Sequence, residues 1–190
     1  MIEQSKIPTR EEALSLLFQF TKSDSLRKHA LAVEAVMRAY AGKLKENENE
    51  WGLTGMLHDF DYEMYPTMEQ HPYVGSKILE ERGYPENIRK AIMGHAPYTK
   101  VERETAMAKC LFACDELSGF IIAVALVRPT KLQGLEPSSV KKKLKDKAFA
   151  RSVSRDDIRN GIAEFGVNED EHISFLIKVL QDNAAELGMV

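Results

Sequence analysis

The chain has 190 residues, of which 44% are hydrophobic, and a formal net charge of −3 from 29 acidic and 26 basic residues. This size and composition predict one compact domain over residues 1–190, with a core that needs no disulfide. The charge balance excludes the basic footprint of a general nucleic-acid-binding protein, and the mixture of apolar and charged residues argues against disorder.

The predicted elements are helical from the N-terminus onward, and no convincing strand alternation occurs. Thr9 followed by Glu12 is typical of a capping box and predicts a first helix through about Phe20. A second helix is expected from about Ser25 to Leu44. The polar segment KENENE then forms a turn, and a short helix over 51–58 leads into the loop DFDYEMYPTMEQ.

Proline and glycine mark the boundaries in the second half of the chain. Pro72 at the first helical position starts a fourth helix that Gly83 ends, and Pro85 starts a fifth through about His95. A long helix is expected over 103–127, although the β-branched part 120–127 leaves a strand as an alternative. Further helices are expected in the ranges 137–145, 155–165 and 169–187, the last two capped by Ser154 and Asn168. The sequence therefore predicts an all-α bundle of roughly eight or nine helices.

The N-terminus and the cysteines indicate the compartment. The segment MIEQSKIPTREEALSLL carries acids where a secretory signal would be apolar, and the longest apolar run is too short for a membrane span. Cys110 and Cys114 are four residues apart, which is not the spacing of a redox or zinc C-x-x-C motif. We expect two buried, reduced thiols in a cytoplasmic protein that does not contact the membrane.

The placement of the histidines and of two aspartates is the main functional signal. His29 and His95 lie within apolar helical stripes, and Asp115 lies in a strongly apolar segment, so all three are expected to point inward. A buried carboxylate without a partner would cost several kcal/mol. A transition metal shared among inward-facing imidazoles and carboxylates meets this demand. The candidate ligands, sufficient for two ions, are His29, His58, Asp59, His71, His95 and Asp115.

Each of these residues also has an ordinary structural interpretation. A single histidine on an apolar face is commonly a hydrogen-bonded core residue, and Asp115 could pair with a lysine or arginine or cap a helix. His71 is placed at a helix N-terminus, where the helix dipole favours the neutral imidazole that binds metals. His172 has acidic neighbours and is expected at the surface. The metal hypothesis therefore depends on the set rather than on any one residue.

Four segments resemble the HD (His-Asp) domain superfamily of metal-dependent phosphohydrolases. They are LRKHALAVEAVM, GMLHDFDYE, HPYVGSKILEERGYPENIRKAIMGH and AMAKCLFACDEL. The resemblance covers about residues 24–127. The segments DELSGFIIAVALVRP and VKKKLKDKAFARSVSR resemble the continuation of small bacterial HDIG-type proteins, and a C-terminal helical extension is expected over about 137–187. The resemblance implies an HD fold in which His29, His58, Asp59 and Asp115 hold a first metal. His71 and His95 would hold a second, with Asp59 shared.

The resemblance implies a phosphomonoesterase or phosphodiesterase that acts on a small phosphorylated metabolite or nucleotide through a metal-activated water. Asp61 and Glu63 are candidate general acids or bases beside Asp59, although both could also be exposed loop acids. Phe60 and Asp61 replace the Ile-Gly of many relatives, and no lysine follows closely, so other cations would have to hold the phosphate. The candidates for that role are Arg128, Lys142 and Lys143, with Lys141 and Lys145.

Two alternatives remain open within this fold. HD relatives with six such ligands include di-iron oxygenases that cleave a C–C or C–P bond, and a metal-bound sensor or binding module is the third hypothesis. Histidine-rich sites favour Fe, Mn, Zn, Co or Ni over Mg or Ca, without a choice among them. The expected cofactor is therefore one or two divalent transition metals.

Overall fold

Side-chain caps and turn residues divide the described chain, residues 7–190 of a computed structural model, into nine α-helices and one short 3-10 helix, with no strand. The prediction of an all-α bundle is confirmed. The elements are α1 (Arg10–Phe20), α2 (Asp24–Leu44), α3 (Glu48–Leu57), α4 (Tyr73–Glu81), α5 (Glu86–His95), η1 (Pro97–Thr99), α6 (Ala106–Leu126), α7 (Pro137–Leu144), α8 (Arg155–Phe165) and α9 (Glu169–Asp182).

Local capping explains several of these boundaries. The capping box is present at α1, where the Thr9 hydroxyl accepts from the Glu12 N–H and the Glu12 carboxylate accepts the Thr9 N–H at 2.8 Å. Ser154 and Asn168 cap α8 and α9 as expected. Thr105 caps α6, so this helix begins three residues later than predicted. The alternative of a strand at 120–127 is wrong, because α6 continues as a helix to Leu126.

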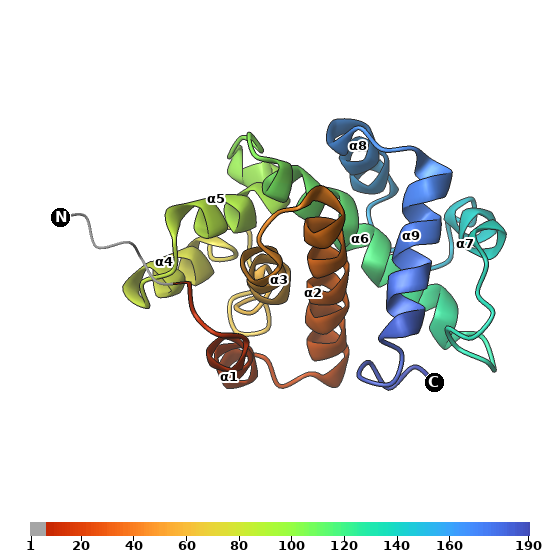
Figure 1. The fold of residues 1–190 in the computed structure, drawn as a ribbon, viewed down its shortest axis with the longest axis horizontal. Helices are drawn as coiled ribbons and strands as arrows, with labels where there is room; N and C mark the ends of the chain where they lie inside the picture. The colour runs from red at the N-terminus through yellow and green to blue at the C-terminus, as the bar shows by residue number, and fades with distance from the viewer. Residues whose placement is uncertain (1–6) are drawn as a thin grey trace.

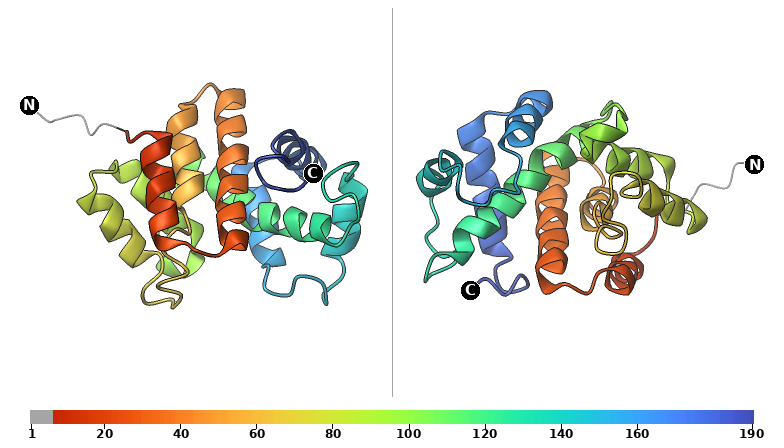
Figure 2. Two further views of the ribbon diagram at one scale, coloured as in Figure 1. Left: turned by 90° about the horizontal axis from the view of Figure 1, so that it is seen from below. Right: turned by 180° about the vertical axis from the view of Figure 1, so that it is seen from behind.

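Two long helices, α2 and α6, form the centre of the molecule. Figures 1 and 2 show α1, α3, α4 and α5 to one side of α2, and α7, α8 and α9 on the other side, around α6. Helix α2 packs against α3 and α6, and α6 also packs against α5 and α8. The four helices α2, α3, α5 and α6 therefore meet in the middle, and their buried side chains belong to one continuous core.

Glycine allows the closest of these helix contacts. A Cβ at Gly55 on α3 would lie 2.8 Å from the Val33 carbonyl oxygen on α2. A Cβ at Gly161 on α8 would lie 2.7 Å from the Cα of Ala113 on α6. Both positions tolerate only hydrogen, because nonbonded carbon and oxygen atoms normally stay more than 3 Å apart. The approach of α3 to α2 brings His29 and His58 onto facing helix surfaces.

Helix α6 is the most apolar element of the fold. Its cysteines, Cys110 and Cys114, are buried free thiols 3.7 Å apart, and burial raises the pKa of the Cys110 thiol well above its ordinary value. This agrees with the expectation of buried, reduced cysteines. In the part of the chain that the structure describes, no helix has both the length and the hydropathy that crossing a bilayer requires.

The prediction that His172 lies at the surface is wrong. Its side chain on α9 is only 1% exposed, because the acidic residues before it form the solvent-facing first turn and His172 begins the buried face. Its Nε2–H donates to the Ala113 carbonyl at 3.1 Å, and its Nδ1 accepts from the Tyr40 hydroxyl at 2.5 Å. The acidic residues that precede His172 in the sequence therefore indicate a helix N-terminus, and they do not indicate that His172 itself is exposed.

Candidate metal centre

Six side chains from separate elements converge between α2, α3, α5 and α6. They are those of His29 on α2, His58 and Asp59 at the end of α3, His71 before α4, His95 at the end of α5 and Asp115 on α6. These are the six residues that the sequence analysis selected as candidate ligands. Helices far apart along the chain therefore deliver imidazoles and carboxylates to one place.

The first group of donors surrounds Nε2 of His58. This atom lies 3.2 Å from Nε2 of His29 and 3.2 Å from Oδ1 of Asp115. Nε2 of His29 is in turn 3.0 Å from the same Asp115 oxygen. Oδ2 of Asp59 completes the group at 3.4 Å from His58. Two imidazoles and two carboxylates thus face a common centre.

The second group uses the other oxygen of Asp59. Oδ1 of Asp59 lies 3.2 Å from Nε2 of His71 and 3.2 Å from Nε2 of His95. The two imidazole nitrogens are 3.3 Å apart. The Asp59 carboxylate therefore presents one oxygen to each group, which is the position of a ligand shared between two ions.

The spacing of these atoms fits metal coordination. Two ligands that are each about 2.1 Å from an ion lie about 3.0 Å apart at a right angle and about 3.4 Å apart at the tetrahedral angle. Most separations between neighbouring donors in both groups are 3.0–3.4 Å, and Nε2 of His29 lies 4.0 Å from Oδ2 of Asp59, still within the span of two ligands on one ion. The residues present therefore fit a metal ion in each group, and the triads His29–His58–Asp59 and Asp59–His71–His95 each satisfy the donor geometry by themselves.

Hydrogen bonds on the far side of three imidazoles set their orientation. Nδ1 of His58 donates to the Gly55 carbonyl at 2.8 Å, and Nδ1 of His95 donates to the Ile92 carbonyl. Because a carbonyl oxygen can only accept, each Nδ1 carries the proton. The Nε2 lone pair of both rings is consequently directed at the donor groups, the arrangement found behind most metal-bound histidines.

His71 is held by a carboxylate instead. Its Nδ1 donates to Oδ1 of Asp61 at 2.8 Å, while Oδ2 of Asp61 accepts the Gly75 N–H at 2.8 Å. Burial opposes the charged ring, but the hydrogen bonds to Asp59 and Asp61 prevail and raise the pKa of His71 to about 9. Two carboxylates lie closer to this ring than the N-terminus of α4, which begins at Tyr73, and their effect on its pKa exceeds that of the helix dipole.

The remaining donors stabilise one another electrostatically. Although burial disfavours its charge, the carboxylates of Asp59 and Asp115 raise the pKa of His58 well above its ordinary value. Burial likewise opposes both carboxylates, and the His58 charge outweighs it, so the pKa of each is lowered. The site therefore favours positive charge at its centre, which a proton or a metal cation can supply.

Residues 26–119 match the family description "HD domain". This range contains all six candidate ligands and helices α2 to α6 up to Gly119. The chain belongs to the HD domain superfamily. No curated protein and no solved structure matches the chain.

A cleft of about 630 Å³ gives access to the candidate metal centre of this HD domain. Apolar side chains of α2 and α6 form much of its wall, including Leu26, Ile122 and Leu126. Its polar wall residues outside the ligands include the carboxyls of Glu116 and Asp157, and no lysine or arginine lines it within the described chain. The cleft is therefore apolar and acidic around the candidate ligands.

Glu116 is a site residue that the sequence analysis missed. It follows Asp115 on α6, lines the cleft, and accepts the Ser154 N–H at 3.2 Å. Burial and the neighbouring charge of Asp115 raise the pKa of Glu116 to about 7. The signal in the sequence was a second carboxyl in the same apolar segment, but only the folded structure shows that this carboxyl lines the cleft.

The structure does not bring the other predicted catalytic residues to the cleft. Asp61 is 1% exposed and has both oxygens occupied by His71 and Gly75, so it orients a candidate ligand and does not reach a substrate. Glu63 accepts the N–H groups of Lys22 and Ser23 at 2.7 and 3.0 Å, on the opposite side of the loop. Its carboxylate therefore anchors the start of α2.

The predicted phosphate-binding cations also lie elsewhere. The Arg128 guanidinium donates to the carbonyls of Lys131 and Gly134, and closes the turn after α6. Lys143 lies over the Phe149 ring at 4.7 Å, and Lys142 on the same helix does not line the cleft. Sequence proximity to α6 suggested these residues, but the chain turns away from the cleft after Leu126.

Proposed function

We propose that this HD-domain protein is a metal-dependent phosphohydrolase, a phosphomonoesterase or phosphodiesterase, acting on a small phosphorylated metabolite or nucleotide. The observation that carries the proposal is the Asp59 carboxylate, with one oxygen facing each of two donor groups. When bound by these residues, divalent ions would supply an acidified water, whose pKa falls from about 15.7 toward neutrality, and a clamp for phosphoryl charge. The histidine-rich donor set suits Fe, Mn, Zn, Co or Ni.

The residues of the chain contribute binding and proton transfer. His29, His58, Asp59 and Asp115 would hold one ion, and His71 and His95 would hold the other together with Asp59. The apolar wall around Ile122 would bind an apolar part of the substrate and exclude water from it. Glu116, a carboxyl in the cleft beside these ligands, would give a proton to the departing alkoxide.

The test is phosphate release from a panel of nucleotides and sugar phosphates, with each of the five metals supplied. Activity on at least one compound, abolished in His58→Ala and Asp59→Ala, is the expected result. His172→Gln removes a histidine outside the centre and should keep the activity. A fully metal-loaded protein that releases phosphate from no compound, or whose activity survives Asp59→Ala, would refute the hydrolase proposal.

The absence of lysine and arginine from the described cleft wall favours a second candidate, a di-iron oxygenase. A substrate without a phosphate would suit walls that combine apolar side chains with Glu116 and Asp157. The same six donors serve either chemistry. An EPR signal from a half-reduced iron pair, together with substrate-dependent O₂ consumption, would establish the oxygenase. If iron-loaded protein shows neither, the oxygenase is excluded and the hydrolase proposal stands.

A further inference from the structure

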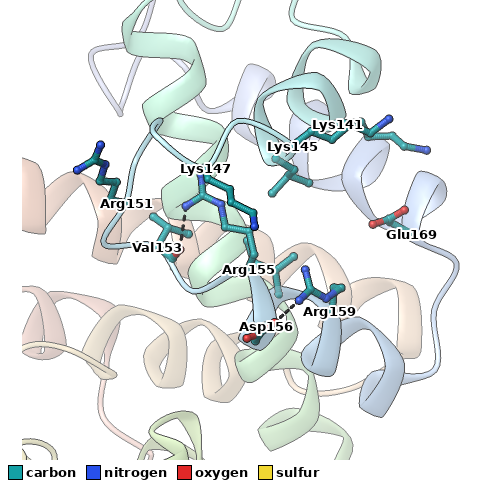
Figure 3. A pocket seen from close by; sticks show the side chains of 11 residues that line it. Lys141, Lys145, Lys147, Arg151, Val153, Arg155, Asp156, Arg159 and Glu169 are labelled. Carbon is teal, nitrogen blue, oxygen red and sulfur yellow. Dashed lines mark hydrogen bonds and ion pairs between the residues drawn. The ribbon is translucent and has the colours of Figure 1, made fainter.

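A second hollow, of about 670 Å³, lies between α7, α8 and the loop that connects them. Figure 3 shows lysines on the α7 side, arginines on the α8 side and further cations on the loop. The cationic residues that line it are Lys141, Lys145, Lys147, Arg151, Arg155 and Arg159. It is separate from the metal cleft, which none of these cations lines.

The hollow concentrates positive charge in an acidic protein. Six cations and two carboxylates line it, a formal excess of four positive charges in a chain whose net charge is −3. Within the described residues, Lys145, Lys147 and Arg151 form no ion pair and no side-chain hydrogen bond, and all three are exposed. Like charges gathered at this density repel one another unless an anion lies among them.

The other cations have partners that leave their positions fixed. Lys141 pairs with Asp170 at 2.5 Å, and Arg159 pairs with Asp156. Lys141 and Lys145 are one helical turn apart and so share a face of α7. The charge is consequently arranged on three sides of one hollow and not spread along a single solvated helix face.

Arg155 connects this hollow to the metal cleft. Its guanidinium donates to the carbonyls of Phe149, Ala150 and Val153, and lies over the Phe120 ring at 4.7 Å. Residues 146–154 are thereby curled around one side chain. Val153 lines both hollows, and Ala150 lines the metal cleft. The loop is therefore a wall that the two sites share.

The conformation of this loop is unfavourable by itself. Ala150 has a φ of 42°, in the left-handed region, which is unfavourable for a residue with a Cβ. Such strain persists only where the surroundings hold it, and it occurs often at ligand clamps and switch segments. A ligand that neutralises Lys147 and Arg151 would hold the loop from the basic side.

Size and charge identify the class of ligand. A hollow of several hundred Å³ suits a small molecule. Each phosphate group carries about −1.5 to −2 charges at pH 7, so two of them balance the formal excess of four. Arginine and lysine together offer the paired and the point contacts that phosphate oxygens accept.

We propose that the basic pocket between α7 and α8 binds a small molecule carrying two or more phosphate groups, and that this ligand holds loop 146–154 against the metal cleft. The proposal goes beyond the function suggested above and does not depend on it. Inorganic tripolyphosphate is the probe. Calorimetry at low and high salt measures its binding, and hydrogen exchange measures the protection of the loop amides.

Two comparisons locate the bound probe. Lys147→Ala combined with Arg151→Ala should weaken binding at least tenfold. Lys77→Ala combined with Arg82→Ala removes the same charge from α4, at the other end of the molecule in Figure 1, and should leave binding within twofold. Asp59→Asn disables the metal centre, where phosphates could also bind, and should leave the affinity unchanged.

The expected result is one tripolyphosphate per chain, affinity that falls with salt, and slower exchange of the 146–154 amides. Equal weakening in both double variants would indicate general charge attraction and overturn the proposal. Loss of binding in Asp59→Asn would place the probe at the metal centre instead. Tighter binding of a twelve-nucleotide oligothymidylate than of tripolyphosphate would overturn the assignment of a small ligand, and unchanged exchange would overturn the role of the loop.

Discussion

Asp61 accepts the Nδ1 proton of His71 at 2.8 Å, and the Nε2 of the same ring lies 3.2 Å from Asp59. The imidazole thus stands between a buried carboxylate that orients it and a carboxylate that shares its candidate metal. Only a short segment of chain separates His71 from Asp59. The structure shows that this segment contains Asp61, the residue that positions His71.

Replacing Asp61 by asparagine should weaken the second metal. The amide keeps the size of the side chain but removes the charge that stabilises the Nδ1–H of His71, and loss of such an outer partner lowers metal affinity about 10–100-fold. A metal titration followed by mass spectrometry should show that the first ion binds as in the wild type. The second ion should need a metal concentration about 10–100-fold higher than in the wild type. Glu63→Gln is the matched control, because Glu63 bonds only the N–H groups of Lys22 and Ser23. Equal affinities in the two variants would show that Asp61 does not position His71.

Metal stoichiometry should depend on which donor is removed. His95→Ala leaves the group of His29, His58, Asp59 and Asp115 intact, so we expect one ion per chain in place of two. Asp59→Ala removes an oxygen from both groups and should reduce the content below one. Elemental analysis of protein purified without chelator measures both. Two ions in Asp59→Ala would contradict a shared carboxylate, and identical contents in wild type and His95→Ala would contradict the second site.

Glu116→Gln should lower kcat about 10²–10⁴-fold and leave metal content unchanged, if the proposed proton transfer is correct. The amide keeps the hydrogen bond from the Ser154 N–H but has no acidic proton. Substrates with leaving groups of low pKa need no protonation, so their rates should fall much less. Asp157→Asn, which removes the other cleft carboxyl outside the candidate ligands, is the control. A rate loss of the same size for every leaving group would assign Glu116 a structural role.

Helix boundaries and the inward-facing candidate ligands could be predicted because both depend on residues that are close together in the sequence. The capping box of Thr9 and Glu12 lies within four residues, and inward-facing His29, His95 and Asp115 follow from helical periodicity. The roles of Asp61 and Glu116 depend on which group beyond the neighbouring turn each side chain meets. Ser154 reaches Glu116 from 38 residues away, a contact that no spacing rule anticipates.

The burial or exposure of single polar residues could not be predicted from the sequence either. His172 was assigned to the surface from its acidic neighbours, yet Tyr40, 132 residues earlier, provides the hydrogen bond that allows its burial. The cations of the basic pocket could likewise be predicted only in part. Lys141 and Lys145 could be grouped by helical spacing, but the loop cations Lys147 and Arg151 join them only through the path of residues 146–154.

The buried His172 should make stability depend on pH. Burial lowers the pKa of His172 below its ordinary value of 6.5. Below pH 6.5 the unfolded chain therefore binds a proton that the folded chain does not, so the free energy of unfolding falls as the pH falls. The slope of this loss is at most about 1.4 kcal/mol per pH unit, and it ends below the lowered pKa of the folded state.

Urea unfolding of wild type and His172→Gln between pH 8 and pH 5 isolates this contribution. Glutamine can accept from Tyr40 and donate to Ala113 but does not titrate, so its profile contains every other pH-dependent group of the protein. The difference in the free energy of unfolding between wild type and His172→Gln should be constant above pH 7. Below pH 6.5 the wild type should lose stability relative to the variant. A difference that stays constant throughout would mean that His172 is protonated equally in the folded and unfolded states. A shift in favour of the wild type at low pH would mean that the folded protein stabilises the imidazolium, opposite to the effect of burial.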